Sequence, residues 1–106
     1  MSHPQLIELD RFRSKGVRVF AGRERGKEVR RVADLNALDN TSSPVNVYVP
    51  LDTLSVNGSF FLGLFGHSIR RLGESGFREH YTFSGKNIER TVSECIEEAL
   101  NTTSPL

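Results

Sequence analysis

The chain has 106 residues, of which 37% are hydrophobic and 25% charged, and its formal net charge is +1. This length suits a single domain, no apolar run approaches the ~20 residues of a membrane-spanning helix, and the first residues lack the basic and apolar regions of a secretion signal. The single cysteine, Cys95, excludes an internal disulfide, so we expect a cytoplasmic domain that does not contact a membrane.

The first part of the chain predicts two strands and a helix. Residues 5–9 and 17–20 favour strands, most clearly the second, where β-branched and aromatic residues cluster. The turn residues 14–16 between them predict a hairpin. Residues 27–38 carry a partial apolar stripe at helical spacing, and a polar connector ending in Pro44 then takes the chain out of the helix.

The middle of the chain predicts a buried strand followed by a long helix. Residues 45–51 are the clearest strand, and Pro50 marks its end. Residues 54–58 predict a turn, and a helix opens at residues 59–62 and runs to about Leu72, before two glycines. The spacing predicts one buried face on this helix, with Phe60 and Leu62 on the opposite side; such an exposed apolar patch would favour a homodimer or a docking site.

Residues 81–83 predict a short strand, residues 88–100 a final helix and residues 101–106 a flexible tail. Strands separated by helices indicate parallel neighbours joined by right-handed crossovers. The N-terminal hairpin would add an antiparallel piece. We therefore expect an α/β fold: a small mixed, mostly parallel sheet of four to five strands with about three helices. It would form one domain over residues 1–106, with its core in 5–100.

The chemistry-bearing residues predict neither a catalytic nor a metal site. The three histidines have no ligand spacing between them, and Cys95 lies on the apolar stripe of the last predicted helix, where it acts as a small hydrophobe. An acid–base pair could assemble from Glu79 and His80, or an enzyme could use Asp52, but nothing in the sequence shows that such groups converge. We expect a protein that is not an enzyme and needs no cofactor.

Positive charge is concentrated at the start of the chain. Residues 1–31 hold nine Arg/Lys against four Asp/Glu, a net of +5, and residues 32–106 hold five against nine, a net of −4. Arg23, Arg25 and Lys27 precede or open a predicted helix, so they are candidates for contacts with an anion or a partner. Nucleic-acid binding is the alternative function, although the region lacks interleaved aromatics for base stacking. It would use Arg11, Arg13, Arg18, Arg23, Arg25, Arg30 and Arg31.

Ser59 stands where the N-cap of the long helix is predicted. Its hydroxyl could accept a hydrogen bond from an amide of the first turn, which alone explains a serine there. A phosphate on Ser59 would instead add nearly two negative charges at the positive end of a helix. Modification could then alter a binding surface without unfolding the domain.

Several short motifs resemble those of one bacterial family. They are a hydrophobic strand at 45–49, Asp52 in the following turn, the helix start Ser59-Phe60-Phe61-Leu62, and Phe65-Gly66 one turn later. Upstream, residues 25–30 are similar to a Ser-Gly-Glu-x-x-Arg segment, with arginine in place of the serine. Over about residues 5–100 the chain resembles the STAS-like family, relatives of the STAS domains of sulfate transporters and anti-sigma factor antagonists.

The resemblance implies a STAS-like fold and a regulatory, non-catalytic role in binding another protein. Its partner would be a kinase-like ATPase or an anti-sigma factor-like regulator. Antagonists of this kind are switched off by phosphorylation of a serine at this helix start, and Ser59 is the matching residue, although the usual Asp-Ser-Ser-Gly is Gly-Ser-Phe-Phe here. The expected partner-binding residues are Asp52, Asn57, Ser59 and Phe60.

Overall fold

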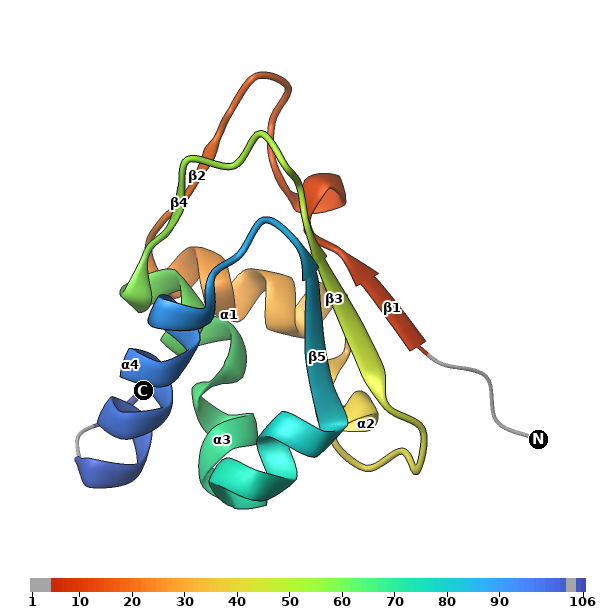
Figure 1. The fold of residues 1–106 in the computed structure, drawn as a ribbon, viewed down its shortest axis with the longest axis vertical. Coiled ribbons are helices and arrows are strands. Elements are labelled where there is room, and N and C mark those ends of the chain that lie inside the picture. Colours follow the sequence, from red (N-terminus) through yellow and green to blue (C-terminus); the bar gives the residue numbers. More distant parts are fainter. Residues whose placement is uncertain (1–4, 103–104) are drawn as a thin grey trace.

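The computed structural model describes residues 5–102 and 105–106, and within them strands and helices alternate along the chain (Figure 1). Their order is β1 (Gln5–Glu8), the 3-10 turn η1 (Leu9–Phe12), β2 (Val19–Phe20), α1 (Arg23–Val32), α2 (Leu35–Leu38), β3 (Val45–Val49), β4 (Ser55–Val56), α3 (Gly58–His80), β5 (Tyr81–Gly85) and α4 (Glu89–Asn101). The predicted α/β class is confirmed. None of the helices described is long and apolar enough to cross a membrane.

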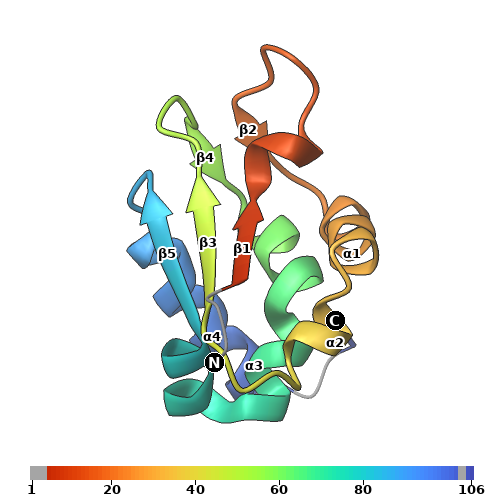
Figure 2. The same ribbon diagram turned by 90° about the vertical axis from the view of Figure 1, so that its right-hand side faces the viewer.

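The described strands form two small parallel sheets rather than one mixed sheet. The larger has the order β1-β3-β5, and the smaller pairs β2 with β4. Figure 2 shows the three arrows of the larger sheet side by side and pointing the same way. Helical crossovers explain this arrangement, because α1 and α2 lie between β1 and β3 in the chain, and α3 lies between β3 and β5.

Helices cover one face of the larger sheet. Along β3 the valines at 45, 47 and 49 are buried, and the alternate residues Asn46 and Tyr48 are half-buried. On that second face Asn46 donates to Thr82 Oγ1 at 3.2 Å and accepts from Ser84 Oγ at 2.8 Å. The period-2 pattern of a strand with one buried face is therefore present even in this central strand.

Aromatic rings join α3 to β5 beneath the sheet. Phe65 has its ring centroid 5.0 Å from that of Phe61, 5.5 Å from Phe77 and 5.2 Å from Tyr81. The ring planes are tilted or perpendicular, as the quadrupoles of aromatic rings prefer. This cluster holds the second half of α3 against the sheet, although the helix is kinked at Gly73, where φ is 75°.

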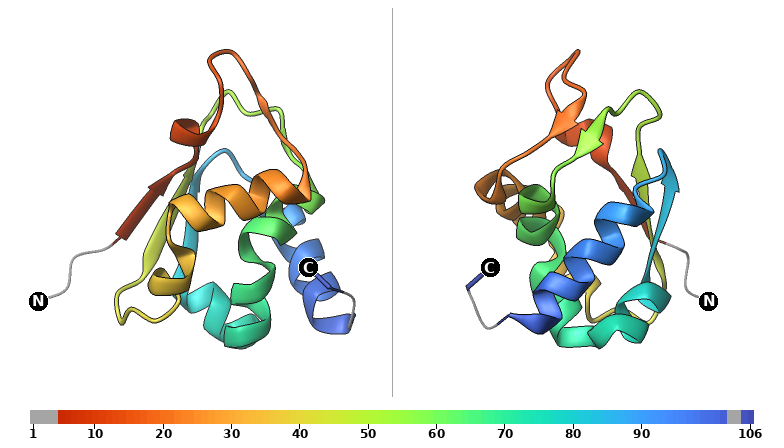
Figure 3. Two further views of the ribbon diagram at one scale, coloured as in Figure 1. Left: turned by 180° about the vertical axis from the view of Figure 1, so that it is seen from behind. Right: turned by 60° about the vertical axis from the view of Figure 1, so that its left-hand side comes forward.

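Two glycines allow α1 and α3 to cross in close contact (Figure 3, left). A Cβ on Gly26 of α1 would lie 2.2 Å from the carbonyl oxygen of Phe60, and one on Gly63 of α3 would lie 2.2 Å from that of Arg23. Such distances are far inside van der Waals contact. The first turns of the two helices are therefore held backbone against backbone.

The prediction of an N-terminal hairpin is wrong, because β1 and β2 do not pair with each other. β1 pairs with β3 and β2 pairs with β4, both in parallel, so the structure has no antiparallel pair among its described residues. The reason is η1, which buries Leu9 directly after β1 and turns the chain away before it can fold back. The turn predicted at 54–58 contains β4.

The helix boundaries differ for local reasons. The helix predicted over 27–38 is two helices, because the chain adopts a left-handed conformation at Asp34, where φ is 54°. The helix predicted to end at Leu72 continues to His80 through the kink at Gly73. Of the tail predicted at 101–106, Asn101 ends α4 and Leu106 lies half-buried over Gly66; residues 103 and 104 lie outside the described residues.

The prediction that Phe60 and Leu62 form an exposed apolar patch is wrong, because both residues are buried. The two side chains are 1% and 3% exposed. α3 packs against α1 on one side and α4 on another, so its first turns are surrounded by apolar contacts rather than having one solvated face. The reason for a homodimer through this helix face disappears with the patch.

The buried thiol of Cys95 on α4 gives a direct test of the packing. Burial, with the nearby carboxylates of Glu98 and Glu94, raises the pKa of the Cys95 thiol to about 11. Because the thiolate is the nucleophile, we expect iodoacetamide to alkylate the native protein at pH 8 at least about tenfold more slowly than the urea-unfolded protein. Mass spectrometry of timed samples measures both rates, and equal rates would contradict this packing.

Candidate functional site

Asn57, not Ser59, is the N-cap of α3. Asn57 has an extended backbone (φ −69°, ψ 144°), and its Oδ1 accepts a hydrogen bond from the Ser59 amide at 2.8 Å. Helical geometry already begins at Gly58, which places Ser59 inside the first turn. Ser59 is exposed, and among the described residues its hydroxyl has no hydrogen-bond partner. The fold therefore does not use this hydroxyl.

The connection before α3 exposes two large apolar side chains. Leu51 is 71% exposed and Leu54 is 68% exposed, while Thr53 between them is buried. Asp52 is also exposed, and its carboxylate lies 2.9 Å from the guanidinium of Arg13. Three of the predicted partner-binding residues, Asp52, Asn57 and Ser59, thus belong to one solvent-facing stretch of chain.

This connection is one half of a protruding arm, which we define as residues 13–20 and 50–56. The two segments run side by side as the β2–β4 pair, and Leu54 N–H donates to the carbonyl of Arg18 at 2.8 Å. Arg13 fixes the base by donating to the carbonyl of Val17 at 2.9 Å. In Figure 1 the arm extends beyond the sheet at the top of the view. Its exposed large apolar residues are Val17, Val19, Leu51 and Leu54.

Phe60 does not belong to this surface. It is buried, and its ring lies 5.3 Å from that of Phe20 at the base of the arm. Its place in the predicted partner-binding set is wrong, because a side chain enclosed by the core cannot contact a partner. Phe60 instead anchors the arm to the start of α3.

The basic residues at the start of α1 lie on the helix that crosses the first turns of α3. Arg23 and Arg25 are exposed, Arg25 donates to the carbonyl of Phe12, and Lys27 Nζ lies 3.6 Å from Glu24. The contact between Gly26 and the Phe60 carbonyl brings this basic turn beside the start of α3. The two predicted groups of site residues therefore come from neighbouring helix ends.

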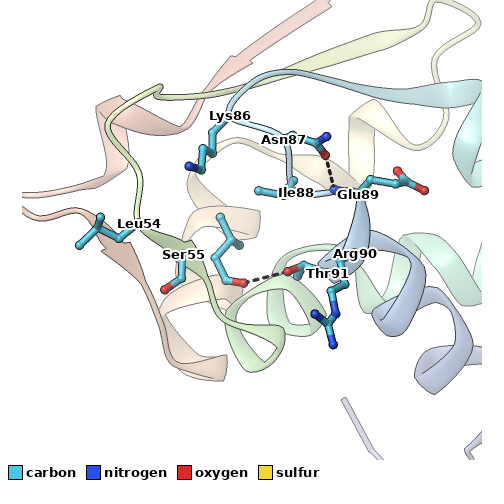
Figure 4. A pocket seen from close by; sticks show the side chains of 9 residues that line it. Leu54, Ser55, Lys86, Asn87, Ile88, Glu89, Arg90 and Thr91 are labelled. Atoms are coloured by element: carbon cyan, nitrogen blue, oxygen red, sulfur yellow. Dashed lines mark hydrogen bonds between the residues drawn. The ribbon is translucent and has the colours of Figure 1, made fainter.

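A cleft of about 500 Å³ separates β4 from the start of α4 (Figure 4). Lys86 is directed into it, while Glu89 is directed away toward Arg78, 2.8 Å distant, whose hydrogen bond holds the pKa of Glu89 below its usual range. Leu54 of the arm lines the same cleft, as does Arg90. Sequence reasoning missed this cleft, since only tertiary packing brings residues 54–56 beside residues 86–91.

The first turn of α4 closes one side of the cleft. Asn87 Oδ1 accepts from the Glu89 amide at 2.9 Å, and Thr91 Oγ1 donates to the carbonyl of Val56 at 3.4 Å. The first bond orders the start of α4, and the second joins α4 to β4. The cleft extends the apolar surface of the arm with a positively charged border.

Two of the basic residues among the first 31, Arg13 and Arg30, have little-exposed side chains that form ion pairs within the molecule. Arg30 and Asp39 form an ion pair at 2.8 Å, with side chains 11% and 2% exposed. Ser68 Oγ donates to Asp39 Oδ1 at 2.7 Å, and Tyr81 O–H donates to the same oxygen at 2.5 Å. Burial, together with the Asp39 carboxylate, raises the pKa of Tyr81. Of the arginines considered for nucleic-acid binding, Arg30 is therefore too buried to contact a phosphate, and Arg13 is already paired with Asp52.

The structure places Glu79 and His80, the residues considered for an acid–base pair, in different environments. Glu79 is exposed, whereas the half-buried ring of His80 has its Nε2 2.6 Å from the carbonyl oxygen of Leu38. Among residues 5–102 and 105–106, no three His, Cys, Asp or Glu side chains converge as metal ligands do.

The fold and site define a small two-layer α/β protein with a protruding, partly apolar arm beside an exposed helix start. Comparison with known protein families, curated proteins and solved structures found no match to the chain.

Proposed function

We propose that this protein is a regulatory, non-catalytic interaction module with a STAS-like fold. The alternation of parallel strands and helices and the strand-to-helix passage from β3 to α3 support this fold. The function rests on one observation: Leu51 and Leu54 are exposed by 71% and 68% on the same stretch of chain as the solvent-facing Ser59.

Exposed leucines on an ordered arm favour a protein partner. Burying a leucine side chain contributes about 1.5–3 kcal/mol, and contiguous exposed apolar side chains typically mark interaction sites. The arm is held by the β2–β4 pair and by the Arg13–Asp52 ion pair, so a partner would bind a preorganised surface. The partner we propose is a kinase-like ATPase or an anti-sigma factor-like regulator.

Basic residues around the arm indicate the charge that the partner's surface should carry. Lys15 and Arg18 are exposed on the arm, and Lys86 and Arg90 border the adjoining cleft. Complementary charge raises association rates and excludes wrong partners. The proposed partner therefore presents an acidic rim around an apolar centre.

Ser59 is the proposed control point. Its hydroxyl is not needed to cap α3, because Asn57 fills that role. A phosphate in the first turn would add nearly two negative charges near the positive helix end. The fold would tolerate the modification, and an acidic partner surface would be repelled.

Site-specific photocrosslinking tests this proposal. A photoreactive phenylalanine analogue at position 54 or 59 is expected to capture one discrete protein in cells that express the chain. The same analogue at Leu100, an exposed residue of α4, is the matched control and should capture none. Adding Ser59→Asp to the position-54 variant should reduce the crosslinked band several-fold.

Identical products at positions 54 and 100 would contradict the proposal, as would no product at 54. Nucleic acid captured through the arm would support the alternative function instead. A folded Ser59→Asp variant that crosslinks as strongly as the parent would remove the control point while leaving the docking surface.

A further inference from the structure

A groove of about 430 Å³ runs along the outer edge of β1. All four residues of the strand line it, and Phe12, Ala33 and Leu38 contribute apolar groups. Figure 2 shows β1 as the last strand of its sheet, with α1 and α2 beyond it. The volume lies within the ~300–1,000 Å³ typical of ligand sites. This groove is separate from the arm.

The outer edge of β1 offers unpaired backbone groups to the groove. The Gln5 amide donates to the carbonyl of Pro44 at 3.1 Å, in register with β3. Along a parallel strand, alternate residues direct their amide and carbonyl toward the same neighbour. Gln5 and Ile7 therefore face β3, and the amides of Leu6 and Glu8 and the carbonyl of Leu6 point outward. No described residue pairs with this edge.

We infer that this groove binds an extended peptide segment of a partner protein, which adds a strand to β1. One wall requires backbone hydrogen-bonding groups from its occupant, and the other requires apolar side chains. A peptide in the extended conformation supplies both, with its alternate side chains toward the helices. Because α1 and α2 wall in this edge, a single extended segment fits better than the sheet edge of a second folded copy.

The positive charge of Arg11 at the end of the groove indicates which charged residue the peptide should carry. Arg11 has a side chain that is 75% exposed, and its Nε lies 3.8 Å from the carboxylate of Glu8, beyond hydrogen-bonding distance. The cation is therefore available to a second carboxylate. The occupant we infer carries alternating apolar residues and an acidic residue that reaches Arg11.

Replacing Leu6 by proline separates backbone pairing from side-chain contact. Proline at this position removes the outward amide and keeps the bonds to β3 that Gln5 and Ile7 make, as edge strands tolerate. Linear nonapeptides selected from a random displayed library on the immobilised protein provide the probe. We expect Leu6→Pro to weaken the selected peptide at least about tenfold in fluorescence anisotropy. Leu6→Ala, which keeps the amide, should change affinity by less than about threefold, and Arg11→Glu should abolish the preference for acidic peptides.

Amide hydrogen exchange on the unmodified protein gives a readout that does not depend on a folded variant. Peptide binding should protect the Leu6 and Glu8 amides. Unchanged exchange at both, no enrichment of linear peptides, or equal affinity of a folded Leu6→Pro protein would overturn the inference. So would a dimer in sedimentation that Leu6→Pro dissociates, because the occupant would then be a second copy. Leu54→Ser and Ser59→Asp should leave peptide affinity unchanged, which separates this groove from the proposed arm surface.

Discussion

Asp39→Ala is expected to destabilise the protein by about 3–5 kcal/mol, the cost of breaking a buried ion pair from one side. The Asp39 carboxylate is 2% exposed and receives hydrogen bonds from Arg30, Ser68 and Tyr81. Removing it leaves the Arg30 cation without its buried partner and two buried hydroxyls without their acceptor. Small domains have about 5–15 kcal/mol of total stability, so this one substitution removes a large part of it.

Urea unfolding followed by circular dichroism measures the effect. Glu28→Ala is the matched control, because Glu28 also pairs with an arginine, Arg31 at 2.6 Å, but both side chains are at least half exposed. Exposed pairs contribute about 0–1 kcal/mol. Equal losses for the two variants would show that the Asp39 network does not hold α1, α2, α3 and β5 together.

Gly26→Ala and Gly63→Ala are expected to destabilise the protein by about 1–3 kcal/mol or more each, the range for overpacking a filled contact. Alanine in a helix is otherwise about 1 kcal/mol more favourable than glycine, so propensity alone predicts the opposite sign. The difference arises because each new methyl would lie 2.2 Å from a backbone carbonyl oxygen, and backbone cannot rotate aside as a side chain can. The helices must separate to admit it.

Gly58→Ala is the control for this prediction. A Cβ there would lie 3.6 Å from the sulfur of Cys95, an ordinary contact distance, so stability should change by no more than about 1 kcal/mol. The double variant Gly26→Ala, Gly63→Ala should lose less than the two single losses added, because one separation of the helices relieves both clashes. Thermal melts of the parent and the four variants measure these changes, and a stabilised Gly26→Ala variant would refute the close crossing.

Local patterns in the sequence predicted the elements better than their partners. The alternation of β3 and the apolar face of α4 are visible in the residues themselves, and both elements lie where they were expected. The pairing of β1 was missed, because a turn-forming Ser14-Lys15-Gly16 favours a hairpin and nothing local signals that η1 will redirect the chain. Strand partners are set by tertiary packing, which short-range propensity does not contain.

The sequence indicated only some residues of the candidate site, again because local patterns do not show which segments pack together. Asp52, Asn57 and Ser59 lie close together in the sequence, so one exposed connection accounts for all three. Phe60 was misplaced because the helical spacing suggested one buried face, whereas α3 is enclosed by both α1 and α4. The contribution of Lys86 and Arg90 depends on residues about 30 positions away in β4, and no motif marks that proximity.

The capping of α3 by Asn57 has a consequence for how this protein can diverge. Since helix initiation is assigned to one side chain and surface chemistry to another two residues later, the second can drift or be redesigned with little thermodynamic penalty. Selection at that serine would then act on what its side chain contacts in solution and not on folding, and an engineer could exchange it while keeping the same scaffold.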